Sequence, residues 1–144
     1  MIIMHVSEKE AEYCKITGPQ LAYDALKDFH DKIKEHFLIL TLNSINEVIA
    51  VRIVTIGLLN QSLVHPREVF WWAIKDNAAY IVLAHNHPSG NINPSEEDLA
   101  ITQKLVEASK IMGIDILDHI IFSKNGYYSF REDGKLEGSL WTKE

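Results

Sequence analysis

One short run of the chain constrains the fold more than any other: an apolar strand, a polar loop and a long helix follow one another directly. Residues 79–84 (AYIVLA) are continuously apolar, which is typical of a strand buried on both faces. Residues 95–112 have the apolar spacing of an amphipathic helix that Gly113 stops. The loop at 85–94 therefore begins where a buried strand ends, and open α/β sheets bind ligands at such ends.

The rest of the chain alternates between helical and strand patterns. Residues 18–34 carry apolar side chains at helical spacing, and we expect one helix there, ending near Lys34. Residues 35–42 and 47–56 predict two strands that form an antiparallel hairpin. We expect further elements as follows: a connection with room for a short strand at 57–64, a helix at 65–74, a strand at 114–123, and a hairpin turn at Asn125-Gly126 leading into 127–131. Together they predict an α/β fold, a mixed central sheet flanked by helices.

Size and composition narrow the class of protein. The 144 residues, 47% of them hydrophobic, fit a single domain over 1–144 with its core at about 18–131. Cys14 is the one cysteine, so no intrachain disulfide can form. No apolar run approaches the ~20 residues that span a membrane, and residues 1–6 are too short for a signal peptide. We expect a soluble, cytoplasmic protein.

The charge argues against one class of partner. The formal net charge is −6, whereas a protein that binds phosphate backbones needs a basic face. The visible lysines, Lys27, Lys32 and Lys34, are scattered among acidic residues. Nucleic acid is therefore not an expected partner of this domain.

A candidate metal site lies in the loop and the start of the helix after it. His85 and His87 are two residues apart, so in an extended backbone both side chains point to the same side. Asp98 lies on the first turn of the next helix, which the loop can fold back over the strand end. Two histidines and one aspartate leave a fourth position for water, as in catalytic zinc sites, whereas structural zinc is closed by four protein ligands. The sequence predicts one Zn²⁺ ion at these residues.

Hydrolysis by such a site needs one more carboxylate. Zinc lowers the pKa of its bound water to roughly 7 and polarises a carbonyl group, and a carboxylate then carries the proton to the leaving amine. The candidates from the sequence are Glu35, Glu47, Glu68, Glu96 and Glu97.

A simpler interpretation of the helix start needs no metal. Ser95-x-x-Asp98 fits a capping box, in which the two side chains satisfy backbone groups at the first turn. Both interpretations of these residues can hold at once. Asp98 is therefore the least independent of the three predicted ligands.

The same residues resemble a known motif. A glutamate, then His85-x-His87, ten residues and Asp98, with Ser95 three before the aspartate, resembles the JAMM (MPN+/JAB) metalloprotease motif. The wider strings HNHPSG, PSEED, VHPREVF, AIKDNAAYIVLA and LDHIIFSKNGYYSF resemble the RadC-like family of JAMM-domain proteins over about residues 19–131. The contiguous letters HNH do not indicate an HNH nuclease, whose residues are spread over a hairpin and a helix.

The resemblance implies both a fold and roles for residues. It implies a JAMM/MPN fold, related to the cytidine-deaminase-like α/β/α sandwich. It assigns His85, His87 and Asp98 as zinc ligands and gives Ser95 the task of holding the carbonyl oxygen. It selects Glu35 as the general base, with Glu47 in reserve. RadC-like proteins often carry an N-terminal helix-hairpin-helix region, for which this chain is too short, so a DNA role argued from that region is weakened.

Two other pairs of residues stand out. Asp118 and His119 lie in an apolar strand. A buried, hydrogen-bonded structural pair is the favoured interpretation, and a role behind the zinc ligands is the alternative. Trp71 and Trp72 are adjacent, so both cannot face the core of one helix. One should be exposed and mark a surface for a homodimer or for substrate.

Three functions fit these features to different degrees. The first is a zinc-dependent peptidase or isopeptidase, with a peptide or protein substrate. The second is a non-catalytic interaction module, associated with DNA repair or replication, that keeps the JAMM fold. The third, a deaminase or small-molecule hydrolase, ranks last because zinc deaminases need cysteine ligands that this chain lacks.

Overall fold

A single mixed sheet forms the centre of the protein. The computed structural model describes residues 3–5, 14–58, 63–136 and 141, and in them six strands pair in the order β1-β3-β2-β4-β5-β6. The pair β4–β5 is parallel, and the other neighbours are antiparallel. The strands are β1 (Ile3–His5), β2 (His36–Leu42), β3 (Val48–Ile56), β4 (Tyr80–Asn86), β5 (Asp115–Ser123) and β6 (Gly126–Ser129).

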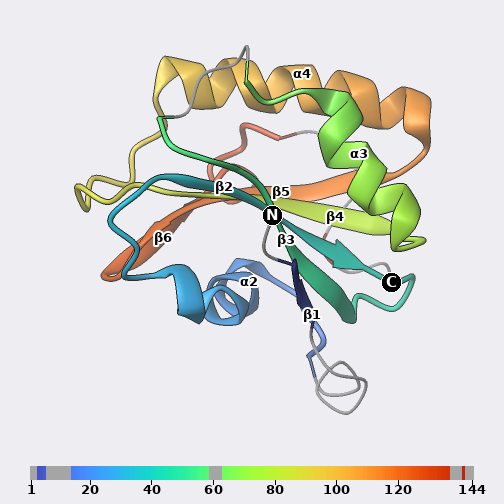
Figure 1. Cartoon of the computed structure of the whole chain (residues 1–144), viewed down its shortest axis with the longest axis horizontal. Coiled ribbons are helices and arrows are strands. Elements are labelled where there is room, and N and C mark those ends of the chain that lie inside the picture. The colour runs from blue at the N-terminus through green and yellow to red at the C-terminus, as the bar shows by residue number, and fades with distance from the viewer. Residues whose placement is uncertain (1–2, 6–13, 59–62, 137–140, 142–144) are drawn as a thin grey trace.

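Helices cover both faces of this sheet. Figure 1 shows α3 and α4 packed on one face and α2 on the other. Their bounds are α2 (Pro19–Ala25), α3 (Pro66–Lys75) and α4 (Glu96–Met112), with a 3-10 turn, η1 (Lys27–Phe29), after α2. The predicted fold class, a mixed α/β sheet flanked by helices, is confirmed, as is the antiparallel β2–β3 hairpin. No helix in the described ranges has the length and apolar character needed to cross a bilayer.

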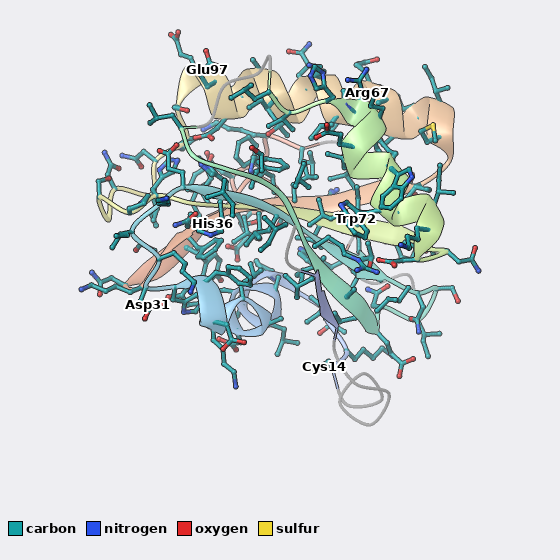
Figure 2. All side chains as sticks on the ribbon, in the orientation of Figure 1. Cys14, Asp31, His36, Arg67, Trp72 and Glu97 are labelled. Atoms are coloured by element: carbon teal, nitrogen blue, oxygen red, sulfur yellow. The ribbon has the colours of Figure 1, made fainter. Side chains whose placement is uncertain are left out.

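The core has two parts because the sheet is buried on both sides. Along β4, Ile81 and Leu83 pack beneath α3 and α4, while Val82 and Ala84 pack toward α2. This alternation between two apolar layers explains why the strand is continuously hydrophobic. Figure 2 shows side chains filling the space between the sheet and the helices on either face.

The helix expected at 18–34 is wrong beyond Ala25. The apolar spacing continues to Ile33, but that side chain is 89% exposed and packs in neither core cluster. The Asn86 side chain holds the loop before β2 instead: its amide donates to the carbonyl of Lys34 at 2.9 Å, and its oxygen accepts from the backbone N–H of His36. A tertiary contact from β4 thus overrides the local helical pattern.

The pairing of β2 with β4 decides where the candidate site lies. The two strands are antiparallel, so β2 starts beside the end of β4, with Phe37 opposite His85. Because β4 runs on to Asn86, His85 lies within the strand rather than in the expected loop. Glu35 precedes β2 by one residue instead of starting it.

The first and last strands also differ from the strands that the sequence predicts. The strand β1 was not expected, and it pairs with β3 at Ala50, Val51 and Arg52. The strand β6 ends at Ser129 rather than at 131. The short strand for which 57–64 leaves room falls largely on residues 59–62, which lie outside the described ranges.

Candidate metal centre

The three predicted ligands meet at the carboxyl end of β4. His85, His87 and Asp98 each offer one ligand atom, and these atoms all lie within 4.8 Å of one another. Nδ1 of His85 lies 3.1 Å from Oδ1 of Asp98, and Nε2 of His87 lies 3.1 Å from Oδ2. His85 and Asp98 are buried, and His87 is half-buried. Among the described residues, this is the group that could hold a metal ion.

A capping box places Asp98 at this point. The backbone N–H of Asp98 donates to Oγ of Ser95 at 3.1 Å, and the backbone N–H of Ser95 donates to Oδ2 of Asp98 at 2.8 Å. The reciprocal bonds fix the first turn of α4 and the direction of the carboxylate. The cap interpretation and the ligand interpretation therefore describe one arrangement, because the cap aims Asp98 at the two histidines.

The charges of the cluster are strongly coupled. Burial by itself would raise the pKa of Asp98, but hydrogen bonds with His85, His87 and the backbone of Ser95 outweigh it and hold that pKa well below its usual range. Burial lowers the pKa of His87, and its hydrogen bonds with Asp98 and with the carbonyl of Asn91 more than reverse this, so it ends raised. The site thus holds a carboxylate anion against two imidazoles.

The hydrogen bonds of the two histidines fit a metal ion. Nδ1 of His87 donates to the carbonyl oxygen of Asn91 at 2.7 Å, since a carbonyl can only accept. In the neutral ring this leaves the lone pair of Nε2 facing Asp98 at 3.1 Å, a contact that either a proton on Nε2 or a metal ion bound by both groups would satisfy. Metal-bound histidines commonly hold a backbone carbonyl in this way. Nε2 of His85 is buried without a hydrogen-bond partner in the described structure, as expected for a group that awaits a ligand.

The structure sorts the five carboxylate candidates. Oε2 of Glu35 lies 3.8 Å from Nε2 of His85, and its side chain is 27% exposed. Glu97 also lines the pocket over the histidines. Glu47, the reserve, lies at the far end of β2, where Asn43 donates to its carboxylate. Glu68 lies on α3, beside Trp71 and Trp72, and Glu96 is exposed at the start of α4.

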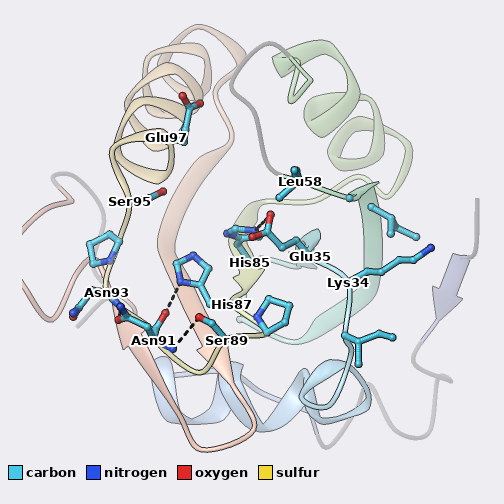
Figure 3. A pocket seen from close by; sticks show the side chains of 15 residues that line it. Lys34, Glu35, Leu58, His85, His87, Ser89, Asn91, Asn93, Ser95 and Glu97 are labelled. Atoms are coloured by element: carbon cyan, nitrogen blue, oxygen red, sulfur yellow. Dashed lines mark hydrogen bonds and ion pairs between the residues drawn. The ribbon is translucent and has the colours of Figure 1, made fainter.

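A pocket of about 910 Å³ opens above these groups. Figure 3 shows His85 and Glu35 close together, with His87 beside them and Ser95 on the opposite wall. The volume falls within the range of pockets that take small ligands or a few peptide residues. Ser95 is exposed there, and within the described ranges its hydroxyl accepts from the backbone N–H of Asp98, so its own O–H can still donate.

Comparison with known proteins places this arrangement in a family. The model of the RadC-like JAB domain matches residues 16–135, most of the chain. The chain belongs to the RadC-like JAB domain family. The family resemblance expected from the sequence is thereby confirmed, and so is the expected JAMM/MPN type of fold.

Curated relatives of this RadC-like domain come from bacteria and archaea. The UPF0758 protein of Methanospirillum hungatei is 52% identical over 129 residues, which are 88% of this chain and 57% of the relative. The UPF0758 protein of Alkaliphilus metalliredigens is 57% identical over 99 residues, 69% of this chain and 43% of the relative. The chain spans about half the length of the curated relatives it matches.

Two residues of the site were missed by sequence reasoning. Asn86 joins the end of β4 to the loop that carries Glu35, and its position between two histidines on the other face of an extended strand was the available signal. The hydroxyl of Thr102 donates to the backbone carbonyl of Asp98 at 2.7 Å and contacts Nδ1 of His119. Its signal was the spacing of four residues from Asp98 on one helix.

Asp118 and His119 are both fully buried, but their side chains are not partners of each other. As successive residues of β5, they face opposite sides of the sheet. The carboxylate of Asp118 accepts from the backbone N–H groups of His119 and Arg131, the hydroxyl of Ser129 and the indole of Trp141. His119 faces α4 and lies behind Asp98 through Thr102. The contacts of Asp118 tie strands and the chain end together, whereas His119 is connected through Thr102 to the candidate ligand Asp98.

The two tryptophans divide as expected. Trp72 is 3% exposed and lies under the guanidinium of Arg52, 4.3 Å from the ring centroid, while Trp71 is 53% exposed. Trp71 lines an apolar groove between α3 and α4. The homodimer or substrate surface expected at this side chain stays a prediction.

Proposed function

We propose that this RadC-like JAB domain is a zinc-dependent hydrolase that cleaves a peptide or isopeptide bond. The observation that carries the proposal is the position of Glu35 at the floor of an open pocket. Its carboxylate lies 3.8 Å from Nε2 of His85, a ring nitrogen with no hydrogen-bond partner in the described part of the chain. A proton-accepting group thus lies beside a three-residue group suited to a metal. That combination is typical of metal-assisted hydrolysis.

Each residue of the site has a separate role in the proposed reaction. Zinc held by His85, His87 and Asp98 supplies a Lewis acid that lowers the pKa of water to about 7 and polarises a carbonyl group. Glu35 accepts a proton from the attacking water as the new C–O bond forms, and delivers it to the amine as the C–N bond breaks. The hydroxyl of Ser95 donates to the carbonyl oxygen as that oxygen gains negative charge.

The remaining contacts keep this geometry fixed. The carbonyl of Asn91 holds the ring of His87 in one orientation, and the capping box holds Asp98. The amide of Asn86 holds the loop that ends at Glu35. A site held by such bonds needs little rearrangement during the reaction, which is a main source of catalytic power.

The test compares metal content and amide hydrolysis. We expect wild-type protein to bind one zinc ion and to cleave members of a quenched-fluorescent peptide or isopeptide library. His87→Ala should lose both properties, and chelator-treated wild type should recover hydrolysis when zinc is restored. Full zinc occupancy without cleavage of any library member overturns the peptidase proposal but not the metal site. Unchanged cellular function in Glu35→Gln would favour the non-catalytic interaction module instead.

A further inference from the structure

The pocket over the metal group has two chemically different walls. One wall is apolar and is formed by Ile33 from the loop before β2, Ile56 at the end of β3, and Leu58 just after it. The facing wall is polar and is formed by the loop between β4 and α4, with the side chains of Ser89, Asn91, Asn93 and Ser95. Figure 3 shows Leu58 and Glu35 on one side of the cavity and this polar set on the other.

The apolar wall is exposed to an unusual degree. Ile33, Ile56 and Leu58 are 89%, 50% and 84% exposed, and none of them packs in either core cluster. Single exposed apolar side chains are common on protein surfaces, but a group gathered at one cavity indicates a binding surface. Here the group forms one wall of the pocket over the proposed reaction centre.

The apolar wall is fixed to the backbone of Glu35. The N–H of Gly57, between Ile56 and Leu58, donates to the carbonyl of Glu35 at 2.8 Å. Gly57 has φ +118°, a conformation that residues with a Cβ rarely adopt. The sharp turn and its hydrogen bond hold Leu58 over the pocket. A ligand side chain that packs on this wall is therefore held close to the proposed general base.

The carboxylate side chains that line the pocket repel a polyanionic ligand. Glu35 and Glu97 both line it, and the side chain of Lys34, the lysine among the described lining residues, points away from Glu35 (Figure 3). A phosphate chain would meet two carboxylates. The asparagine amides of the polar wall each carry donors and an acceptor, which suit the N–H and C=O groups of a peptide backbone. The cavity thus combines an apolar surface for a side chain with polar groups for a main chain.

We propose that Ile33, Ile56 and Leu58 form the specificity site of this hydrolase and select a peptide with a large aliphatic side chain next to the bond that is cleaved. The inference rests on the proposed function for its chemistry, but it concerns binding and can be tested without turnover. It identifies the substrate class as an apolar peptide segment lying between the two walls, rather than a polyanion such as a nucleotide or an acidic peptide.

The experiment uses the zinc-loaded Glu35→Gln protein, which binds without cleaving. Two acetylated, amidated hexapeptides are titrated against it by NMR chemical shifts, one with leucine at its two central positions and one with serine there. We expect the leucine peptide to bind at least about tenfold more tightly, as is usual when an apolar pocket loses its ligand group. Leu58→Ser and Ile33→Ser, each added to this background, should remove the preference.

The matched control is Ile45→Ser. Ile45 is 56% exposed and lies in the turn between β2 and β3, at the far end of β2, so its replacement should leave the preference intact. Equal binding of the two peptides, binding of neither, or a preference that survives in Leu58→Ser and Ile33→Ser overturns the specificity site. A leucine preference in binding, with no cleavage of any member of the peptide or isopeptide library by zinc-loaded wild type, overturns the proposed function alone. Equal kcat/KM for both peptides overturns the specificity site alone.

Discussion

Glu35 and His85 face each other across the floor of the pocket, with a carboxylate oxygen 3.8 Å from Nε2 of the imidazole. Two adjacent antiparallel strands produce this approach, because β2 begins where β4 ends. The glutamate lies too far for a hydrogen bond to the ring, but its carboxylate adjoins one of the three predicted ligands. This contact makes Glu35 the residue to test as the general base.

Glu35→Gln should lower kcat/KM by about 10²- to 10⁴-fold, the usual contribution of a positioned general base. Glutamine keeps the shape of the side chain but cannot accept the proton, and it is not one of the three ligands, so zinc content should stay at one per chain. Steady-state kinetics and metal analysis on the same preparation check both points. Glu47→Gln is the control, because Glu47 pairs with Asn43 at the other end of β2. A large loss in the control, or none in Glu35→Gln, contradicts the assignment.

Much of the site could be predicted from the sequence because the three predicted metal ligands lie close together along the chain. His85, His87 and Asp98 are linked by one strand end, one loop and one helix start, so local geometry alone brings them together. The capping box was also visible from Ser95 and Asp98. Patterns of this kind depend on hydrogen bonds between residues a few positions apart, so the folded protein forms them as the sequence predicts.

Contacts between distant segments could not be predicted in the same way. The helical pattern of 18–34 ends early because Asn86, about fifty residues later, binds the backbone of the loop. Arg52 lies within an apolar strand, yet it forms a buried ion pair with Asp76, at 2% and 5% exposure. Asp76 is the C-cap residue of α3, and Arg52 lies in β3. Neither of these two contacts could be predicted without the tertiary packing that brings the segments together, because the residue patterns of one sequence do not reveal such pairs.

Ser95 should show two separable roles. Ser95→Ala removes the cap, which should lower the free energy of unfolding by about 0.5–2 kcal/mol, and it also removes the hydroxyl that would hold the carbonyl oxygen, lowering kcat by about 10²- to 10³-fold. Ser95→Asp restores the cap but supplies no donor, so stability should return without activity. Ser95→Thr should restore both. Urea denaturation and kinetics measure the two effects, and full activity in Ser95→Asp would exclude a donor role.

Thr102 should position Asp98 for the metal. Its hydroxyl donates to the carbonyl of Asp98, so the nearby Nδ1 of His119 must donate to the hydroxyl in turn. Thr102→Val removes both bonds and should weaken zinc binding by about 10- to 100-fold, the range found for groups behind metal ligands. Thr102→Ser should restore the affinity. Competition with a chromophoric chelator gives the Kd.

A purely structural role for Thr102 makes a different prediction. Loss of the hydroxyl leaves a buried N–H of His119 without a partner, which costs about 1–3 kcal/mol of stability. If that is the whole effect, Thr102→Val will unfold more easily in chelator but will bind zinc with the Kd of wild type. Comparing the two variants in both assays therefore decides between the interpretations.

The burial of His119 should make the protein less stable as the pH falls. Burial lowers its pKa to about 3, against about 6.5 in an unfolded chain. As the pH falls below about 6.5, the unfolded chain takes up a proton at this histidine that the folded chain does not. The free energy of unfolding therefore decreases by up to about 1.4 kcal/mol per pH unit until the pH nears the pKa of the folded state.

His119→Phe keeps a flat ring stacked on Phe130 and removes this proton. Urea denaturation of metal-free protein from about pH 7 to about pH 4 should therefore show a shallower loss in the variant. Asp98, whose lowered pKa acts with the same sign, is present in both proteins and cancels in the difference. Parallel curves for the two proteins would mean that His119 takes up its proton at the same pH in the folded state as in the unfolded chain, and would contradict the lowered pKa.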